Sequence, residues 1–108
     1  MFILIIVIFS PSKEEYLCKE YKRFVNSNYH GTVNKIYIDK KNHNMKVIVL
    51  RLQNGSYKRL AFDLDTSIFF SYVRENDTLF KKKGDEGIEI IRNGMDTIIN
   101  INYGVNCN

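Results

Sequence analysis

The first regular pattern of polar and apolar residues in the chain predicts an amphipathic helix. Ser12, followed three residues later by Glu15, forms a capping box that marks a helix start. Apolar residues then recur at helical spacing, with charged residues between them: Leu17, Tyr21, Phe24 and Val25. The pattern predicts a helix over about 13–26, ended by the asparagine-rich stretch 26–28, with its apolar stripe docked on a core.

From residue 31 onward the pattern is typical of β-strands. Alternating or β-branched stretches predict strands at 31–39, 45–53, 56–64, 78–82, 87–92 and 95–103. Between the third and fourth, Asp65 or Thr66 caps a predicted short helix. The dipeptides Asn54-Gly55 and Asn93-Gly94 each predict a two-residue hairpin turn.

Pairing across the first of these turns predicts which side chains share a face of the hairpin. One face then carries Val47, Val49, Leu60 and Phe62. The other carries a second apolar set with one arginine among its members: Ile48, Leu50, Leu52, Tyr57, Ala61 and Arg59. Because both faces are substantially apolar, we expect this hairpin to be covered on both sides.

The order of elements favours a mainly β (α+β) fold. A meander, a connecting helix and further strands is the order of a small OB-like barrel, and an SH3-like barrel is the nearest alternative. We expect five to six strands, an N-terminal amphipathic helix and a short connecting helix. The predicted layout is a hydrophobic segment at 1–11, the helix at 12–28 and the barrel domain at 29–108.

The opening run, Phe2–Phe9, consists of eight apolar residues. This is too short for a membrane span, which needs about 20 residues, but it fits the core of a signal peptide, about 7 to 15. No lysine or arginine precedes it, and the cleavage signal around Pro11 is poor. We interpret the run as an export signal or membrane anchor. The alternative is a buried strand of the fold.

Composition and charge indicate a folded domain and do not identify its partner. A chain of 108 residues with 44% hydrophobic and 26% charged residues is typical of one folded domain. The net charge of +4 suits an anionic surface, although ordinary soluble proteins reach it. The predicted basic surface is Lys40, Lys41, Lys81, Lys82 and Lys83, joined by the pair Lys58-Arg59.

These basic residues permit a second interpretation, a barrel that binds single-stranded nucleic acid. Tyr37, Tyr57 and Phe62 would then provide stacking faces. Against this, lysines commonly protect sheet edges from pairing with other chains, and the aromatic residues are expected in the core. Export would also remove most nucleic acid from reach. We therefore do not expect nucleic acid as the partner.

Residues 29–103 resemble a family of small uncharacterised exported or lipoprotein-like β proteins of anaerobic Gram-negative bacteria. The resemblance rests on HGTVNKIYIDKKNH, IFFSYVRENDTLFKKK and GIEIIRNG. His43 matches the family's Asn-His pair, and Asp77, Thr78 and Lys81 match a turn motif in which Asn76 replaces the usual glycine. No cysteine stands at a lipoprotein position. The resemblance implies the fold and an exported location, and it implies no activity.

Few residues offer chemistry. The cysteines, Cys18 and Cys107, either form a disulfide or remain separate, with Cys18 packed on the helix and Cys107 in a frayed tail. Neither histidine, His30 or His43, has a ligand at zinc spacing, and the start of a calcium loop at 63–67 lacks its glycine and glutamate. We expect no catalytic set, cofactor or metal.

The sequence therefore predicts a non-enzymatic interaction or structural module in the cell envelope, either periplasmic, membrane-anchored or secreted. Its partner would be a protein or an envelope component, and the N-terminal segment would contact the membrane. The alternative is a cytosolic OB-like module that binds single-stranded nucleic acid.

Overall fold

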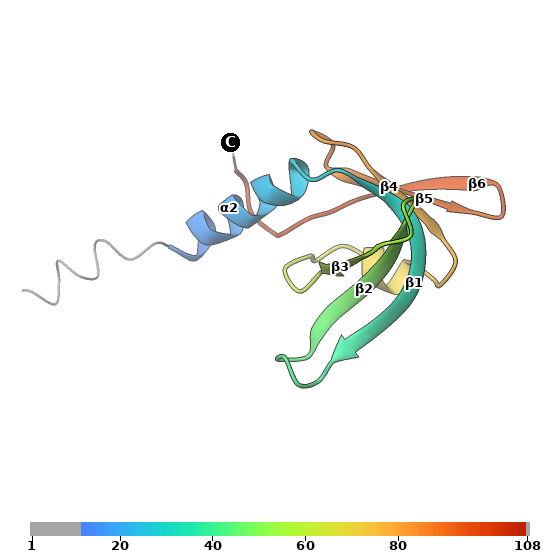
Figure 1. The fold of residues 1–108 in the computed structure, drawn as a ribbon. Helices are drawn as coiled ribbons and strands as arrows, with labels where there is room; N and C mark the ends of the chain where they lie inside the picture. The colour runs from blue at the N-terminus through green and yellow to red at the C-terminus, as the bar shows by residue number, and fades with distance from the viewer. Residues whose placement is uncertain (1–11, 108) are drawn as a thin grey trace, which may run out of the picture.

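A computed structural model describes residues 12–107 and shows six antiparallel strands in one sheet, with one helix before it (Figure 1). The opening run at 1–11 lies outside the described residues, so its role as a signal or anchor stays a prediction. The elements in chain order are α2 (Lys13–Val25), β1 (Tyr29–Asp39), β2 (Met45–Leu52), β3 (Tyr57–Ala61), α3 (Phe69–Tyr72), β4 (Thr78–Lys81), β5 (Gly87–Arg92) and β6 (Met95–Asn100).

Helix α2 starts and ends where the sequence predicts. The Ser12 hydroxyl accepts a hydrogen bond from the backbone N–H of Glu15 at 3.1 Å, so one of the unpaired N–H groups of the first turn gains a partner. Asn26 forms the C-cap. Tyr21 and Phe24 are partly buried and pack against the core, which confirms the predicted docking face.

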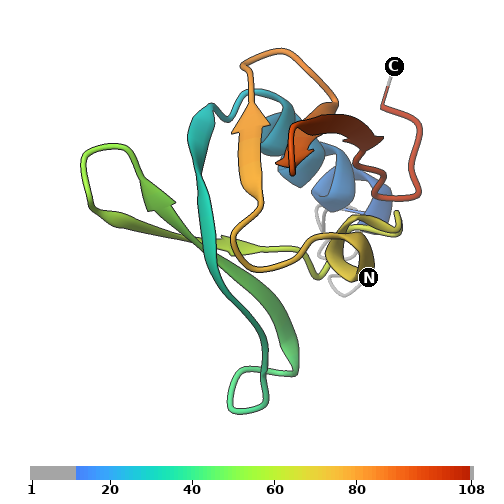
Figure 2. The ribbon, with the colours of Figure 1, turned by 90° about the vertical axis from the view of Figure 1, so that its right-hand side faces the viewer.

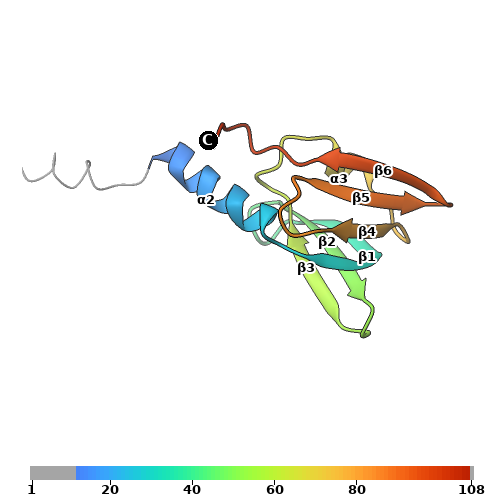
Figure 3. The same ribbon diagram turned by 90° about the horizontal axis from the view of Figure 1, so that it is seen from above.

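The sheet is open, so the predicted closed barrel is wrong. The strand order is β3-β2-β1-β4-β5-β6, which leaves β3 and β6 at opposite edges within residues 12–107 (Figure 3). Closure would require an edge-to-edge pairing, and no such pairing occurs between the described strands. The mainly β class, with one helix and one short helix, is confirmed.

β1 bends and joins two parts of the sheet. We call β1, β2 and β3 the first half-sheet, and β4, β5 and β6 the second half-sheet. β1 pairs with β2 along almost its whole length but with β4 only over Tyr29–Thr32, and its register shifts between Val33 and Lys35. Such a bulge increases local twist. The β1–β2 hairpin therefore extends away from the second half-sheet (Figure 2).

The Asn54-Gly55 hairpin does not have the predicted register. The Leu52 N–H bonds to Ser56 O at 2.8 Å, which encloses a three-residue loop in which Gly55 has φ 86°. A loop one residue longer moves every β3 side chain to the other face. Leu60 and Phe62 therefore share a face with Ile48 and Leu50, whereas Arg59 and Tyr57 lie opposite.

The core lies on one face of the bent sheet, which we call the inner face. α3 and the segment after β6 cover it, as the ribbon shows in Figure 1. Its fully buried members come from both half-sheets and from α3, including Ile48, Leu50, Phe69, Leu79, Ile88 and Ile90. The opposite face, the outer face, carries the alternate side chains of every strand and is the surface that the sheet presents to solvent.

Candidate functional site

Asp77, the first residue of the family-like turn motif, is buried in an ion pair. Its carboxylate accepts hydrogen bonds from Arg92 Nε and Nη2 at 2.8 and 2.7 Å. It also accepts one from the backbone N–H of Arg74 at 2.8 Å. The hydrogen bonds from Arg92 are the main cause that lowers the pKa of Asp77. Asn76 precedes it with φ 73°, a backbone angle that asparagine tolerates.

Lys81, the last residue of that motif, is fully buried. Its ammonium donates to the carbonyls of Val25 at 2.9 Å, Ser27 at 3.3 Å and Lys82 at 2.6 Å, and it lies 4.9 Å from the centre of the Phe24 ring. Burial lowers its pKa, and the charge of Asp85 partly offsets this effect. The prediction that Lys81 belongs to a basic surface is therefore wrong.

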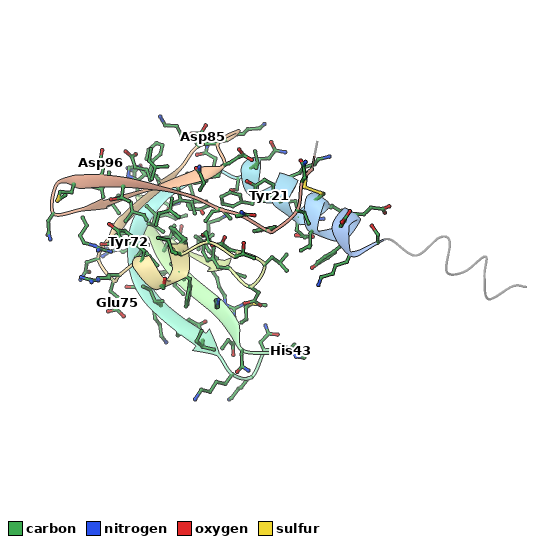
Figure 4. All side chains as sticks on the ribbon, turned by 180° about the vertical axis from the view of Figure 1, so that it is seen from behind. Tyr21, His43, Tyr72, Glu75, Asp85 and Asp96 are labelled. Atoms are coloured by element: carbon green, nitrogen blue, oxygen red, sulfur yellow. A yellow bond between two sulfur atoms is a disulfide. The ribbon has the colours of Figure 1, made fainter. Side chains whose placement is uncertain are left out.

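The other predicted basic residues do not form one surface. Lys40 and Lys41 are exposed in the β1–β2 turn, whereas Lys82 and Lys83 are exposed in the β4–β5 loop. Figure 4 labels His43 in the first of these loops and Asp85 in the second, at well separated ends of the molecule. Each pair of lysines ends a hairpin, which is consistent with solvated turns.

The structure gathers a different basic set on the outer face of the first half-sheet. Lys35, Arg51 and Arg59 come from β1, β2 and β3, and the pairing register places them on one face with Tyr37 and Tyr57. We call these five residues the basic outer face. Arg59 and both tyrosines are candidate residues in the sequence, whereas Lys35 and Arg51 are not, because the predicted β2–β3 register places Arg51 and Arg59 on opposite faces.

Contacts within the basic outer face order its side chains. Arg59 on β3 donates to the Tyr37 hydroxyl at 3.4 Å and to Asp39 at 2.8 Å, both on β1, so its side chain spans β2. The Lys35 ammonium lies 4.8 Å from the centre of the Tyr37 ring. Tyr57 is 61% exposed. Phe62, the third aromatic residue considered for stacking, is buried in the core.

A polar hollow of about 440 Å³ adjoins this face where β1 and β2 meet the loop before β4. Its lining is rich in amides and hydroxyls, with Arg51 at its border: Thr32, Asn34, Gln53, Asn76 and Thr78. His30 also lines it and bonds to Gln53 at 3.2 Å, with its ring 4.7 Å from that of Phe80. Gly31 leaves room for the close approach of Arg51 O, which a Cβ would meet at 2.6 Å.

The outer face of the second half-sheet has the opposite character. The register places Glu89 and Asp96 there with Ile98 and Phe80, and Asp85 and Glu86 border the same region. Ile98 on this face is strongly exposed, as is Met95, which the register places on the opposite face at the β5–β6 turn. Lys82 is the lysine of this region, with its ammonium 5.4 Å from the centre of the Phe80 ring. One sheet therefore presents a basic half and a half in which acidic and apolar side chains surround one lysine.

The ends of the described chain are fastened together by a disulfide between Cys18 and Cys107, whose Cα atoms lie 5.5 Å apart (Figure 4). Beside it, the Tyr21 hydroxyl shares its one proton between two acceptors, Glu86 Oε1 and Ile101 O, each at 2.9 Å. The Tyr21 ring packs on Tyr103, with the ring centres 5.2 Å apart. Burial and the bond to Glu86 raise the pKa of Tyr21 to about 12. The C-terminal segment is therefore held against α2.

The two aspartates that resemble the start of a calcium loop accept hydrogen bonds from backbone N–H groups. Asp63 accepts from the Lys46 N–H at 2.6 Å, and Asp65 accepts from Ser67 and from the Asn102 N–H at 3.0 Å. Residues 12–107 hold no group of three or more His, Cys, Asp or Glu side chains placed to bind a metal ion. In the same part of the chain, no helix is long and apolar enough to cross a membrane.

No protein-family model, curated protein or solved structure matches this chain.

Proposed function

We propose that this chain is a non-enzymatic binding module that works outside the cytoplasm, in the cell envelope or secreted. The observation that carries the proposal is the disulfide between Cys18 and Cys107. Disulfides persist in oxidising compartments and are rare in the cytosol of most organisms. The apolar run Phe2–Phe9, with the length of a signal-peptide core, supports the same location.

A binding role is supported by the positions of the charged side chains. The buried charged side chains of residues 12–107, Asp65, Asp77 and Lys81, bond to Arg92 or to backbone groups and so serve the scaffold. Lys35 and Arg51 lie on the outer face of the first half-sheet beside Tyr37 and the exposed Tyr57, an arrangement suited to binding a ligand surface. Within this proposal the domain is an open relative of OB-like or SH3-like barrels, in which the bent β1 serves both half-sheets.

The first test is the location and redox state of the full chain in a bacterial host. Cells are lysed in the presence of a thiol-alkylating reagent without reductant, fractionated, and the protein is examined by intact mass. We expect the protein in the envelope or medium with neither cysteine alkylated. A protein found in the cytosol with two alkylated cysteines would refute the proposal.

A Cys107→Ser variant provides the matched control. Its single remaining thiol at Cys18 is expected to take up one alkyl group, which proves that the reagent and conditions detect a free cysteine. A mixed disulfide at Cys18 would appear instead as the added mass of its thiol partner. The same spectrum reads the mature N-terminus, so it also tests whether the first residues are removed.

A further inference from the structure

We propose that the basic outer face binds an acidic polysaccharide, with a negatively charged sugar held at Arg51 and Tyr57. This inference rests on the proposed function, because it names the ligand class of an envelope or secreted module. The face consists of Lys35, Tyr37, Arg51, Tyr57 and Arg59, and the polar hollow continues it.

The charge of this face selects an anionic ligand. Three cations project from three neighbouring strands, and within residues 12–107 the register places one acidic side chain, Asp39, among them. Asp39 is already paired with Arg59 at 2.8 Å. Lys35 and Arg51 are therefore the cations left to meet a ligand. A guanidinium forms two parallel hydrogen bonds to a carboxylate, sulfate or phosphate group.

Each of these cations has a tyrosine beside it. Arg51 is directly opposite Tyr57 in the β2–β3 pairing, and Lys35 lies against the Tyr37 ring. The flat apolar face of a sugar ring packs on the face of an aromatic ring, and the tyrosine hydroxyl stays available for polar contacts. Two cation–tyrosine pairs on adjoining strands match a polymer in which ring and charge repeat together.

The hollow beside Arg51 favours a ligand rich in hydroxyl groups. Its amide and hydroxyl lining offers both donors and acceptors, which a sugar chain can use in several orientations. A membrane surface would instead be met by exposed apolar side chains. The most exposed of these, Met95 and Ile98, lie on the second half-sheet and not on the basic outer face.

The rest of the sheet limits where an anionic chain can lie. Glu89 and Asp96 on the outer face of the second half-sheet would repel it, and Asp85 and Glu86 extend that acidic region. A bound polymer is therefore directed along β1, β2 and β3. The charge pattern selects a path as well as a ligand class.

The test measures binding of the oxidised full chain, purified in non-ionic detergent, to polygalacturonate oligosaccharides by calorimetry. Neutral dextran of equal length shows whether the charge is needed. We expect binding to polygalacturonate that weakens as salt rises, and none to dextran. A Lys35→Gln/Arg51→Gln variant is expected to bind about tenfold more weakly or worse, since it loses its charge-assisted hydrogen bonds. Tyr57→Ala is expected to weaken binding several-fold.

Lys82→Gln/Lys83→Gln is the matched control, because it removes the same charge from exposed side chains of the β4–β5 loop, outside the basic outer face. Its affinity should stay within about twofold of the wild type. Equal losses in the two double variants would show non-specific attraction and overturn the proposal. All variants are exposed substitutions, and an unchanged melting temperature verifies their folding.

Two further probes separate the competing partners. Tighter binding to an oligothymidylate of equal charge would overturn the inference in favour of nucleic acid. Tighter binding to vesicles that contain anionic phospholipid would overturn it in favour of a membrane surface. Failure to bind polygalacturonate by a chain found in the envelope refutes this inference alone, whereas a cytosolic chain with free thiols refutes the proposed function.

Discussion

The two ends of β4 both bury a charge, but they compensate it in different ways. Just before the strand, Asp77 meets a full opposite charge, Arg92, in two hydrogen bonds. At the end of the strand, Lys81 meets the carbonyl oxygens of Val25, Ser27 and Lys82 and the face of an aromatic ring. One end is an ion pair, and the other is a cation held by dipoles.

The difference follows from what each end fastens. Asp77 connects the α3–β4 loop to β5, since Arg92 also donates to the carbonyl of Tyr72 at 2.8 Å. Lys81 connects the sheet to the last residues of α2, where the unpaired carbonyls carry the negative end of the helix dipole and favour a cation. The first contact positions parts of the sheet, and the second positions the helix on the sheet.

The largest expected loss of stability comes from breaking the ion pair between Asp77 and Arg92. Asp77→Ala leaves Arg92 without its counter-charge in a partly buried site, and removing one partner of a buried pair costs about 3 kcal/mol. Urea unfolding measures this loss in the free energy of unfolding. Glu20→Ala removes an acid from an exposed pair with Arg23 and should cost less than about 0.5 kcal/mol. Equal losses would contradict the structural role of Asp77.

A smaller effect is expected at the dipole end. Lys81→Met keeps an apolar side chain against Phe24 but removes three hydrogen bonds to carbonyls, which should cost about 2 kcal/mol. The neighbouring Lys82→Met is the control, because that side chain is exposed and its loss should change the free energy of unfolding little. Should Lys82→Met prove the more damaging of the two, the buried role of Lys81 would be excluded.

The smallest expected effect is a difference in pH dependence between the stability losses at the two ends of β4. Arg92 lowers the pKa of Asp77 below its ordinary value of 3.8, so the stabilisation is present above that pH and is lost as pH falls through the lowered pKa. The difference in free energy of unfolding between wild type and Asp77→Ala should therefore shrink below about pH 4. The cost of Lys81→Met should not change over this range, since Lys81 stays charged there. A constant Asp77→Ala difference down to pH 2 would contradict the assignment.

Much of the fold follows from local chemistry that the sequence states directly. The capping box at Ser12 defines the start of α2, and Asn93-Gly94, with φ 53° and 77°, forms the predicted two-residue turn that sets the register of β5 and β6. Asn54-Gly55 carries the same signal but forms a longer loop. Burial decides between the two registers: the observed one places Leu60 and Phe62 with the core and Arg59 with solvent.

The charged residues were harder to place because their environment is set by distant parts of the chain. Nothing near Lys81 in sequence indicates that its ammonium will meet the carbonyl of Val25, although alternation with the buried Leu79 was a usable signal. The prediction that Asp65 or Thr66 caps the short helix is wrong. Asp65 accepts from the backbone N–H groups of Ser67 and Asn102, the Thr66 hydroxyl donates to Asn102 O, and α3 begins at Phe69. The basic outer face needs the correct register of two hairpins before its members can be seen together.

The bridge between Cys18 and Cys107 also has a mechanical consequence. A pull applied to the chain before Cys18 and after Cys107 runs through the sulfur–sulfur bond, and the 88 residues between them bear no load. The hydrogen bonds of the sheet are thus shielded from tension along the polymer backbone. A domain built this way can form part of a polypeptide that is under tension, and its sheet would stay folded until the disulfide is reduced.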